Sequence, residues 1–394
     1  MRLSFFAYHY LHRLRKASPA SKDAEGVFAC SADGRRKPCR NGRRDPAESK
    51  LAAAADRAYH RRIGNVRKLR LGRMRDMSNA IARRIEELER LAPPLTAPPD
   101  LDEYWEETLR RYSAKPLNAK KTRVETPFTY MEVYKVAYEG FDETPVHGWY
   151  LLPKFAGGKP LPCVVLYHGY GGSRGNPEDY ASYLMMGLAV FAIDVRGQAG
   201  ETGNLLAQDH GMIGGWVTQG ILDRDTCYYK AITIDALKAL DWAGEQPEVD
   251  PARICATGGS QGGGLAMIAA ALSDKPAIAV PHIPNMCQMD FGMLHSASSL
   301  AEAAAFVERF PEHLDAVLRT LSYFDNLNLA HRIRIPIFVT VGLKDPITMP
   351  ETIYAAYNRV RSEKTIVPYP FSGHVVTGDH RRKALEFVAS KLLK

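Results

Sequence analysis

The residues best suited to chemistry are one serine, one aspartate and one histidine in the C-terminal half of the chain. The serine, Ser260, lies in the stretch Gly258-Gly259-Ser260-Gln261-Gly262, between an apolar run at 253–257 and a small-residue, apolar run at 263–272. This order predicts a strand, a sharp turn and a helix, with the serine at the turn. Glycines let such a turn pass close to its neighbours, and the G-x-S-x-G pattern projects the serine hydroxyl outward as a nucleophile.

A serine hydroxyl is a weak nucleophile until a base takes its proton and a third group orients that base. Asp345 follows the apolar run 335–341, and His374 follows a strand-like run at 365–370 and precedes the last predicted helix. The α/β-hydrolase fold carries its orienting acid and its general base at these places, in the chain order Ser, Asp, His. Each residue alone is an ordinary loop residue, but their joint order predicts a catalytic triad.

A glycine-rich loop, 168–175, follows an earlier predicted strand at 162–167. As the dinucleotide-binding pattern G-x-G-x-x-G it fails, because Arg174 stands where the third glycine belongs. In a hydrolase, one backbone N–H of this loop and the N–H that follows the nucleophile stabilise the oxyanion. We therefore predict Tyr170 and Gln261 as the two donors. His168 is expected to support the loop rather than to act as a base.

The wider pattern predicts an α/β fold of the α/β-hydrolase type, with a mostly parallel sheet flanked by helices. Strands and helices alternate from about residue 162 to the C-terminus, interrupted by a long loop at 199–226 and a largely helical insertion at about 297–321. Amphipathic helices and antiparallel strands are expected before this core. These expected elements are a helix at 78–91, a helix that begins near 98, and strands at 127–137 and 146–152.

Charge divides the chain into two parts. Residues 1–76 hold 20 of the 52 Lys and Arg and 7 of the 44 Asp and Glu, so 77–394 holds 32 basic against 37 acidic residues. The basicity thus belongs to the first segment. We expect 1–76 to be a disordered basic extension or sequence ahead of the true start, in preference to a nucleic-acid-binding arm, and 77–394 to be one hydrolase domain. No nucleic-acid partner is expected for the body.

The six cysteines form no C-x-x-C pair and no metal-ligand spacing with histidine. This pattern favours a reducing, cytoplasmic location and predicts no metal. Motifs for a cofactor are also missing from the sequence, and there is no apolar run of the ~18 residues that a membrane span needs.

The chain resembles the acetyl xylan esterase/cephalosporin C deacetylase family of α/β-hydrolases over about residues 85–394. The stretches that carry the resemblance are Pro99–Leu109, Arg196-Gly197-Gln198, Gly220–Asp223, Gly258–Gly263, Arg319–Asp325 and Gly342–Asp345. The resemblance implies Ser260 as nucleophile, Asp345 as orienting acid and His374 as base, with Tyr170 and Gln261 at the oxyanion. It also implies removal of acetyl groups from small O-acetylated substrates, such as xylo-oligosaccharides or cephalosporin C-like esters, without a cofactor.

Two features go with this resemblance. Family members resemble one another in forming hexamers, and 212–222 is similar to their interface loop, which implies a homo-oligomer. The family has Glu directly after the catalytic His, whereas this chain has Val375. Because that Glu is outside the triad, we expect the chemistry to survive and the loop or the subunit contacts to differ.

Other functions fit the same residues. A broad-specificity carboxylesterase or a dienelactone-type hydrolase would use the same triad on a different acyl group. An oligopeptidase would also carry a propeller-sized domain, and we expect no such domain in this sequence, which argues against that function. A catalytically silent binding protein of the same fold would place no demand on the triad, and Val375 is the one feature that favours it.

Overall fold

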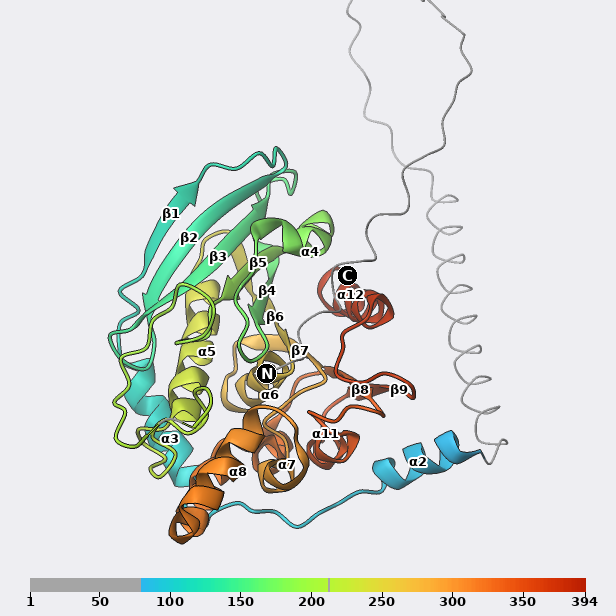
Figure 1. Ribbon diagram of the computed structural model, residues 1–394. Coiled ribbons are helices and arrows are strands. Elements are labelled where there is room, and N and C mark those ends of the chain that lie inside the picture. The colour runs from blue at the N-terminus through green and yellow to red at the C-terminus, as the bar shows by residue number, and fades with distance from the viewer. Residues whose placement is uncertain (1–78, 212) are drawn as a thin grey trace, which may run out of the picture. The chain divides into compact units, whose positions relative to one another are not determined.

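The computed structural model describes residues 79–211 and 213–394 (Figure 1). The basic segment 1–76 lies outside the described residues, so its predicted disorder stays a prediction. The strands are β1 (Lys120–Val124), β2 (Met131–Glu139), β3 (Pro145–Pro153), β4 (Leu161–Tyr167), β5 (Ala189–Ile193), β6 (Val249–Gly259), β7 (Pro276–His282), β8 (Ile337–Gly342) and β9 (Lys364–Tyr369).

All of these strands form one sheet in the order β1-β2-β3-β5-β4-β6-β7-β8-β9. The first three strands are antiparallel, and β3 joins β5 in antiparallel fashion. From β5 to β9 every neighbouring pair is parallel. The carboxyl ends of these six strands therefore lie at one edge of the sheet, the edge where ligands bind in open α/β sheets.

Helices cover both faces of the sheet. The long helices are α2 (Ala80–Glu89), α3 (Leu101–Ser113), α5 (Tyr228–Gly244), α6 (Gln261–Leu272), α8 (Ser299–Arg309), α9 (Leu314–Ser322), α11 (Pro350–Tyr357) and α12 (Gly378–Leu392). The shorter ones are η1 (Pro177–Tyr180), α4 (Ala181–Met185), α7 (Met289–His295), η2 (Pro311–His313), α10 (Asn326–Leu329) and η3 (Ala330–Arg332).

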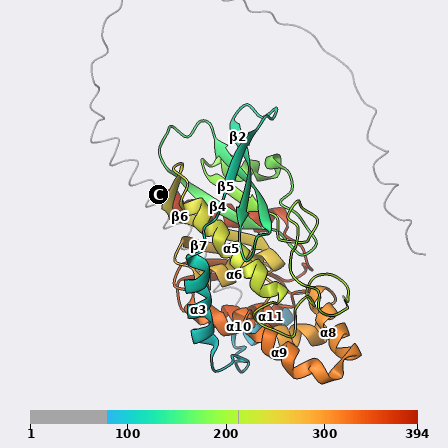
Figure 2. The same cartoon turned by 90° about the vertical axis from the view of Figure 1, so that its left-hand side faces the viewer.

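The alternation of side chains along each strand sends apolar groups to both faces, as a buried parallel sheet requires. On one face, α5, α6 and α11 pack on residues such as Val165, Ala256 and Val339. On the other, α4 and α12 pack on Val164, Val280 and Phe338 among others. Figure 2 shows α5 and α6 in front of the strands that they cover. Helices packed on both faces thereby make the sheet a rigid support for the loops at its carboxyl edge.

The expected α/β-hydrolase fold with a mostly parallel sheet is confirmed, with local differences. Strand β1 was not expected, because its residues Lys120–Val124 are nearly all exposed at the sheet edge and have no apolar alternation. Between β4 and β5 the chain forms a 3₁₀ turn followed by the short helix α4, and Gly187, at φ +81°, follows the end of that helix. The helical insertion begins at Met289, ahead of the expected position.

Within the described residues, no helix has the length and apolar character needed to cross a bilayer. The four cysteines of this part of the chain are buried free thiols: Cys163, Cys227, Cys255 and Cys287.

The packing of α6 against β4 generates a stability prediction. A Cβ on Gly262 would overlap the backbone carbonyl of Tyr167, so Gly262→Ala should lower the free energy of unfolding by about 3 kcal/mol or more. Urea denaturation measures this. Gly244→Ala is the matched control, because its Cβ would lie 3.7 Å from the nearest heavy atom. Equal stability of the two variants would contradict the close approach of α6 to β4.

Candidate active site

Ser260 lies at the turn between β6 and α6, in a backbone conformation that residues other than glycine rarely adopt. Its φ is 56° and its ψ is −118°. Residues of this kind persist only where the surroundings fix them. Here the Ser260 N–H donates to the His282 carbonyl at 3.0 Å, and the Ser260 carbonyl accepts from the N–H groups of Gly264 (3.0 Å) and Asn285 (2.9 Å). The turn thus places the serine side chain at the carboxyl edge of the sheet.

The structure brings Ser260, His374 and Asp345 into one hydrogen-bonded line. The Nδ1 atom of His374 lies 2.8 Å from Asp345 Oδ2, and its Nε2 atom lies 3.0 Å from Ser260 Oγ. Since the carboxylate can only accept, Nδ1 carries the proton, and Nε2 is left to accept the serine proton. The three come from loops after β6, β8 and β9, far apart in sequence. This arrangement can activate a hydroxyl for attack on a carbonyl carbon.

Asp345 is held in place by its own loop. Its side chain is fully buried, and Oδ1 accepts from the N–H groups of Ile347 (2.9 Å) and Thr348 (3.0 Å). The Thr348 hydroxyl lies 3.0 Å from Asp345 Oδ2 and 3.3 Å from His374 Nδ1. The sequence reasoning missed Thr348. A threonine three positions after an aspartate in a loop is a recognisable turn pattern, and it is the signal that could have found it.

The loop after β4 lies against the nucleophile. A Cβ built on Gly169 would be 3.7 Å from the Cβ of Ser260, so the adjoining Tyr170 backbone is close to the reacting atoms. Gln261 is buried at the first position of α6. Within the described residues, neither backbone N–H has a hydrogen-bond acceptor. Backbone N–H groups that lack an acceptor near a serine hydroxyl can stabilise an oxyanion.

His168 supports this loop, as expected. Its Nδ1 donates to the Gly169 carbonyl at 2.8 Å, and its Nε2 accepts from the Val195 N–H at 2.8 Å. Both ring nitrogens are therefore occupied. Burial lowers the pKa of His168, which keeps the ring neutral.

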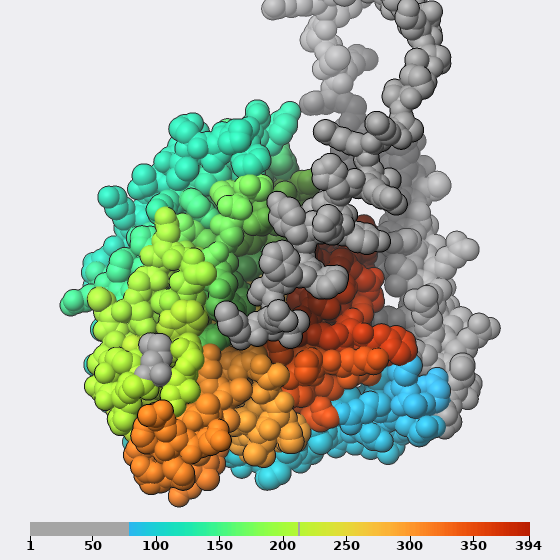
Figure 3. Space-filling model, in the orientation of Figure 1, coloured from blue at the N-terminus to red at the C-terminus, as the bar shows by residue number. Residues whose placement is uncertain are grey.

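The Tyr170 side chain links the loop to two segments that adjoin the site. Its hydroxyl donates to Glu302 Oε2 on α8 at 2.7 Å and accepts from the Trp216 N–H at 2.7 Å. Gly214 and Gly215 leave no space for a side chain beside Glu302 and the Tyr170 hydroxyl. Figure 3 shows the segment after β5 (yellow-green) and the insertion (orange) side by side on the surface. The Tyr170 side chain therefore ties these two segments to the loop after β4.

Two residues that follow His374 bear on the choice of base. His380 is fully buried on α12 with its ring against Tyr369, so it cannot reach a substrate. Val375 is 47% exposed, and its N–H donates to the Gly373 carbonyl at 2.9 Å. An apolar, exposed side chain therefore lies directly after the candidate base, at the position where the resemblance implies Glu.

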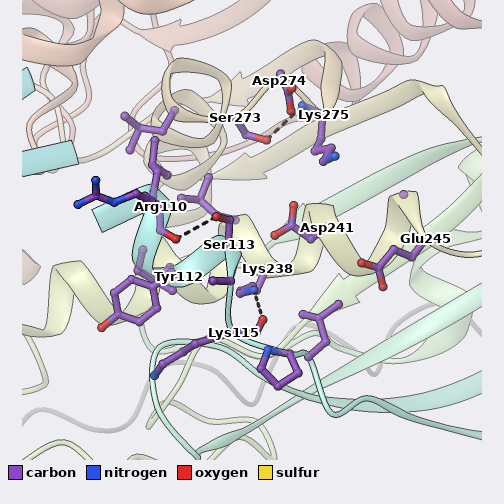
Figure 4. A pocket seen from close by; sticks show the side chains of 18 of the residues that line it. Arg110, Tyr112, Ser113, Lys115, Lys238, Asp241, Glu245, Ser273, Asp274 and Lys275 are labelled. Carbon is purple, nitrogen blue, oxygen red and sulfur yellow. Dashed lines mark hydrogen bonds between the residues drawn. The ribbon is translucent and has the colours of Figure 1, made fainter. Parts of the chain in front are cut away.

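A separate groove of about 950 Å³ lies between the end of α3, α5 and the turn after α6 (Figure 4). Its charged lining includes Arg110, Lys238 and Asp241, and the Lys238 ammonium donates to the Lys115 carbonyl at 2.7 Å. None of the five predicted site residues lines it. Size alone therefore does not mark the site in this molecule. Within the described residues, no cluster of three or more His, Cys, Asp or Glu is arranged to hold a metal ion.

The model of the acetyl xylan esterase (AXE1) family matches residues 78–391. The chain belongs to the acetyl xylan esterase family. Membership places it among the ester hydrolases with the serine-hydrolase fold, and the predicted family is confirmed.

Solved structures and a curated relative agree. The acetyl xylan esterase from Paenibacillus sp. R4 is 38% identical, with a TM-score of 0.76 over 78% of this chain and 99% of that chain. Acetyl xylan esterase 1 from Thermoanaerobacterium sp. JW/SL YS485 is 28% identical, with a TM-score of 0.74 over 77% and 98%. The acetyl esterase Axe7A of Xylanibacter ruminicola is 25% identical over 74% of this chain, which spans 66% of its length.

His282 is buried next to the Ser260 turn, and its titration predicts how the stability of this acetyl xylan esterase family member depends on pH. Burial lowers the pKa of His282 to about 4, from 6.5. The folded chain thus binds fewer protons than the unfolded chain between these values. Its stability is fully present above pH 6.5 and falls by about 3 kcal/mol as the pH drops to 4. Replacement His282→Asn removes this titration.

Urea denaturation at pH 7.5, 6, 5 and 4.5 provides the check. The wild type should lose more stability over this series than His282→Asn does, whatever the variant's stability at pH 7.5. Parallel pH profiles of the two proteins would show that His282 is not held neutral by the fold.

Proposed function

We propose that this chain is a serine acetylesterase that removes acetyl groups from small O-acetylated substrates, of the kind of acetylated xylo-oligosaccharides or cephalosporin C-like esters. The hydrogen-bonded line from Asp345 through His374 to Ser260 carries the proposal. The family and the names of its relatives support acetate as the acyl group.

In the first half-reaction, Ser260 Oγ attacks the acetyl carbonyl carbon while His374 Nε2 takes the hydroxyl proton. The carbonyl oxygen becomes an oxyanion and accepts from the N–H groups of Tyr170 and Gln261, each worth about 3–4 kcal/mol in the transition state. His374 then gives its proton to the leaving alcohol, and the acetyl group stays on Ser260. Asp345 holds the imidazole orientation and stabilises its charged form.

In the second half-reaction, water takes the place of the alcohol. His374 Nε2 accepts a proton from the water, whose oxygen attacks the acetyl carbon of the acetyl-enzyme. Collapse of the second oxyanion expels Ser260 Oγ, which regains its proton from His374, and acetate leaves. In both half-reactions the proton is transferred through one atom, His374 Nε2, which acts first as base and then as acid.

Hydrolysis of p-nitrophenyl acetate, butyrate and octanoate by the wild type and Ser260→Ala tests this function. We expect kcat/KM to be highest for acetate and Ser260→Ala to lower kcat by about six orders of magnitude, because the triad acts as a unit. A preference for octanoate would favour a broad carboxylesterase instead. Activity that Ser260→Ala retains to within tenfold would contradict the triad itself.

We further propose that the chain is a homo-oligomer, a hexamer by resemblance to its family, in which 212–222 contributes to the contact between subunits. Light scattering of the purified chain should then give six times the 43.8 kDa mass of one chain. A mass of one chain at micromolar concentration would contradict it.

The division into a basic extension, 1–76, and a hydrolase domain, 77–394, stays a proposal, as does a cytoplasmic location. The match of the family model from residue 78 supports the division, and four buried free thiols fit a reducing compartment.

A further inference from the structure

The turn Arg196-Gly197-Gln198 after β5 has no part in the triad, yet its glutamine makes three hydrogen bonds beside the nucleophile. Gln198 is 7% exposed. Its Oε1 accepts from the Gly171 N–H at 2.8 Å, and its Nε2 donates to the Tyr228 hydroxyl at 2.8 Å and to Gln261 Oε1 at 3.0 Å. One side chain therefore joins the loop after β4 to the first residue of α6.

The direction of these bonds is fixed by chemistry. The Tyr228 hydroxyl donates its proton to the Arg196 carbonyl at 2.6 Å, so it can only accept from Gln198. Burial raises the pKa of Tyr228, which keeps that proton in place at neutral pH. The Gly171 N–H can only donate. An amide turned by 180° would set NH₂ against this N–H, so one orientation of Gln198 satisfies all three partners.

The turn itself is held in place by the ion pairs of Arg196. The Arg196 guanidinium is fully buried and binds Asp235 through two hydrogen bonds, Nε to Oδ2 at 2.6 Å and Nη2 to Oδ1 at 2.8 Å. Its Nη1 binds Asp142 at 3.0 Å. Bidentate pairs of this kind fix both position and direction. Gln198 thus extends from a rigidly held turn toward Gly171 and Gln261.

The residues that Gln198 binds adjoin both predicted oxyanion donors. Gly171 follows Tyr170, so holding the Gly171 N–H orients the peptide plane that it shares with the Tyr170 carbonyl. The Gln261 side chain accepts from Gln198 through its Oε1 atom, and within the described residues its amide nitrogen is buried without a hydrogen-bond partner. The contact with Gln198 is therefore the hydrogen bond that holds the Gln261 side chain.

We propose that Gln198 is a positioning residue that fixes the separation of the Tyr170 and Gln261 N–H groups around the oxyanion. This inference rests on the proposed function and adds a residue outside the triad and the oxyanion hole. Misplacement of a donor by about 1 Å costs on the order of 10²-fold in rate. Loss of Gln198 should therefore weaken stabilisation of the transition state and leave ground-state binding little changed.

The test compares Gln198→Ala with wild type on p-nitrophenyl acetate and on its thionoacetate analogue, in which sulfur replaces the carbonyl oxygen. A well-formed set of donors favours oxygen over the larger, weaker acceptor sulfur. We expect kcat for the oxygen ester to fall 10- to 100-fold, KM to change less than threefold, and the oxygen-to-sulfur ratio of kcat/KM to fall at least fivefold.

Gln219→Ala is the matched control. Gln219 is a buried glutamine, 4% exposed, in the long segment between β5 and α5. Its side chain forms hydrogen bonds with Asn204 and with the Leu206 carbonyl, and with neither Gly171 nor Gln261. It should keep kcat within threefold and keep the ratio. If Gln198→Ala does not fold, Tyr228→Phe takes its place, because it frees the amide to turn. We expect it to lower kcat three- to tenfold and to lower the ratio.

Ser260→Ala, assayed in parallel, separates two failures. If it is as active as wild type, the proposed function is wrong and the role of Gln198 with it. If wild-type activity depends on Ser260 while Gln198→Ala keeps both kcat and the oxygen-to-sulfur ratio, only the role of Gln198 is wrong. An equal loss in the Gln219 and Gln198 variants would also overturn it, since general loosening would then explain both.

Discussion

The close approach of the Ser260 turn to β4 is the constraint on which the rest of the structure depends. Gly258 and Gly262 leave no room for a side chain beside the Tyr167 carbonyl, so the turn sits directly on the neighbouring strand. This contact brings the loop after β4 to the nucleophile and starts α6 behind it. The positive φ of Ser260 is held by backbone hydrogen bonds from both sides of the turn. A strained residue is thereby made rigid, as pre-organised chemistry requires.

The parallel part of the sheet brings the residues of the candidate site together. The loops after β4, β5, β6, β8 and β9 all leave the same edge, and each contributes one part of the candidate site. The oxyanion loop, the Gln198 turn, the nucleophile, the acid and the base follow in that order along the chain. No single segment holds the site together. Small movements of one strand relative to another would separate donors from the serine, which explains why buried ion pairs and glutamine bonds reinforce this edge.

The hydrogen-bonded line of Ser260, His374 and Asp345 could be predicted from the sequence because each residue follows an apolar run that marks a strand, and strand ends meet at one edge. The role of Gln198 could not, because its partners lie 27, 30 and 63 positions away and nothing local indicates them. Thr348 lay between these cases, since only its spacing from Asp345 hinted at the contact. Strand β1 could not be predicted, because the exposed edge strand has no alternating hydrophobic pattern.

Covalent labelling can identify the nucleophilic residue. The chain is treated with diethyl p-nitrophenyl phosphate, which leaves a stable phosphoryl group on an activated serine, and the labelled peptide is identified by mass spectrometry. We expect one diethylphosphoryl group per chain, on Ser260, with activity lost in proportion to labelling. Complete inactivation with Ser260 unlabelled, or full labelling of Ser260 with activity retained, would contradict it.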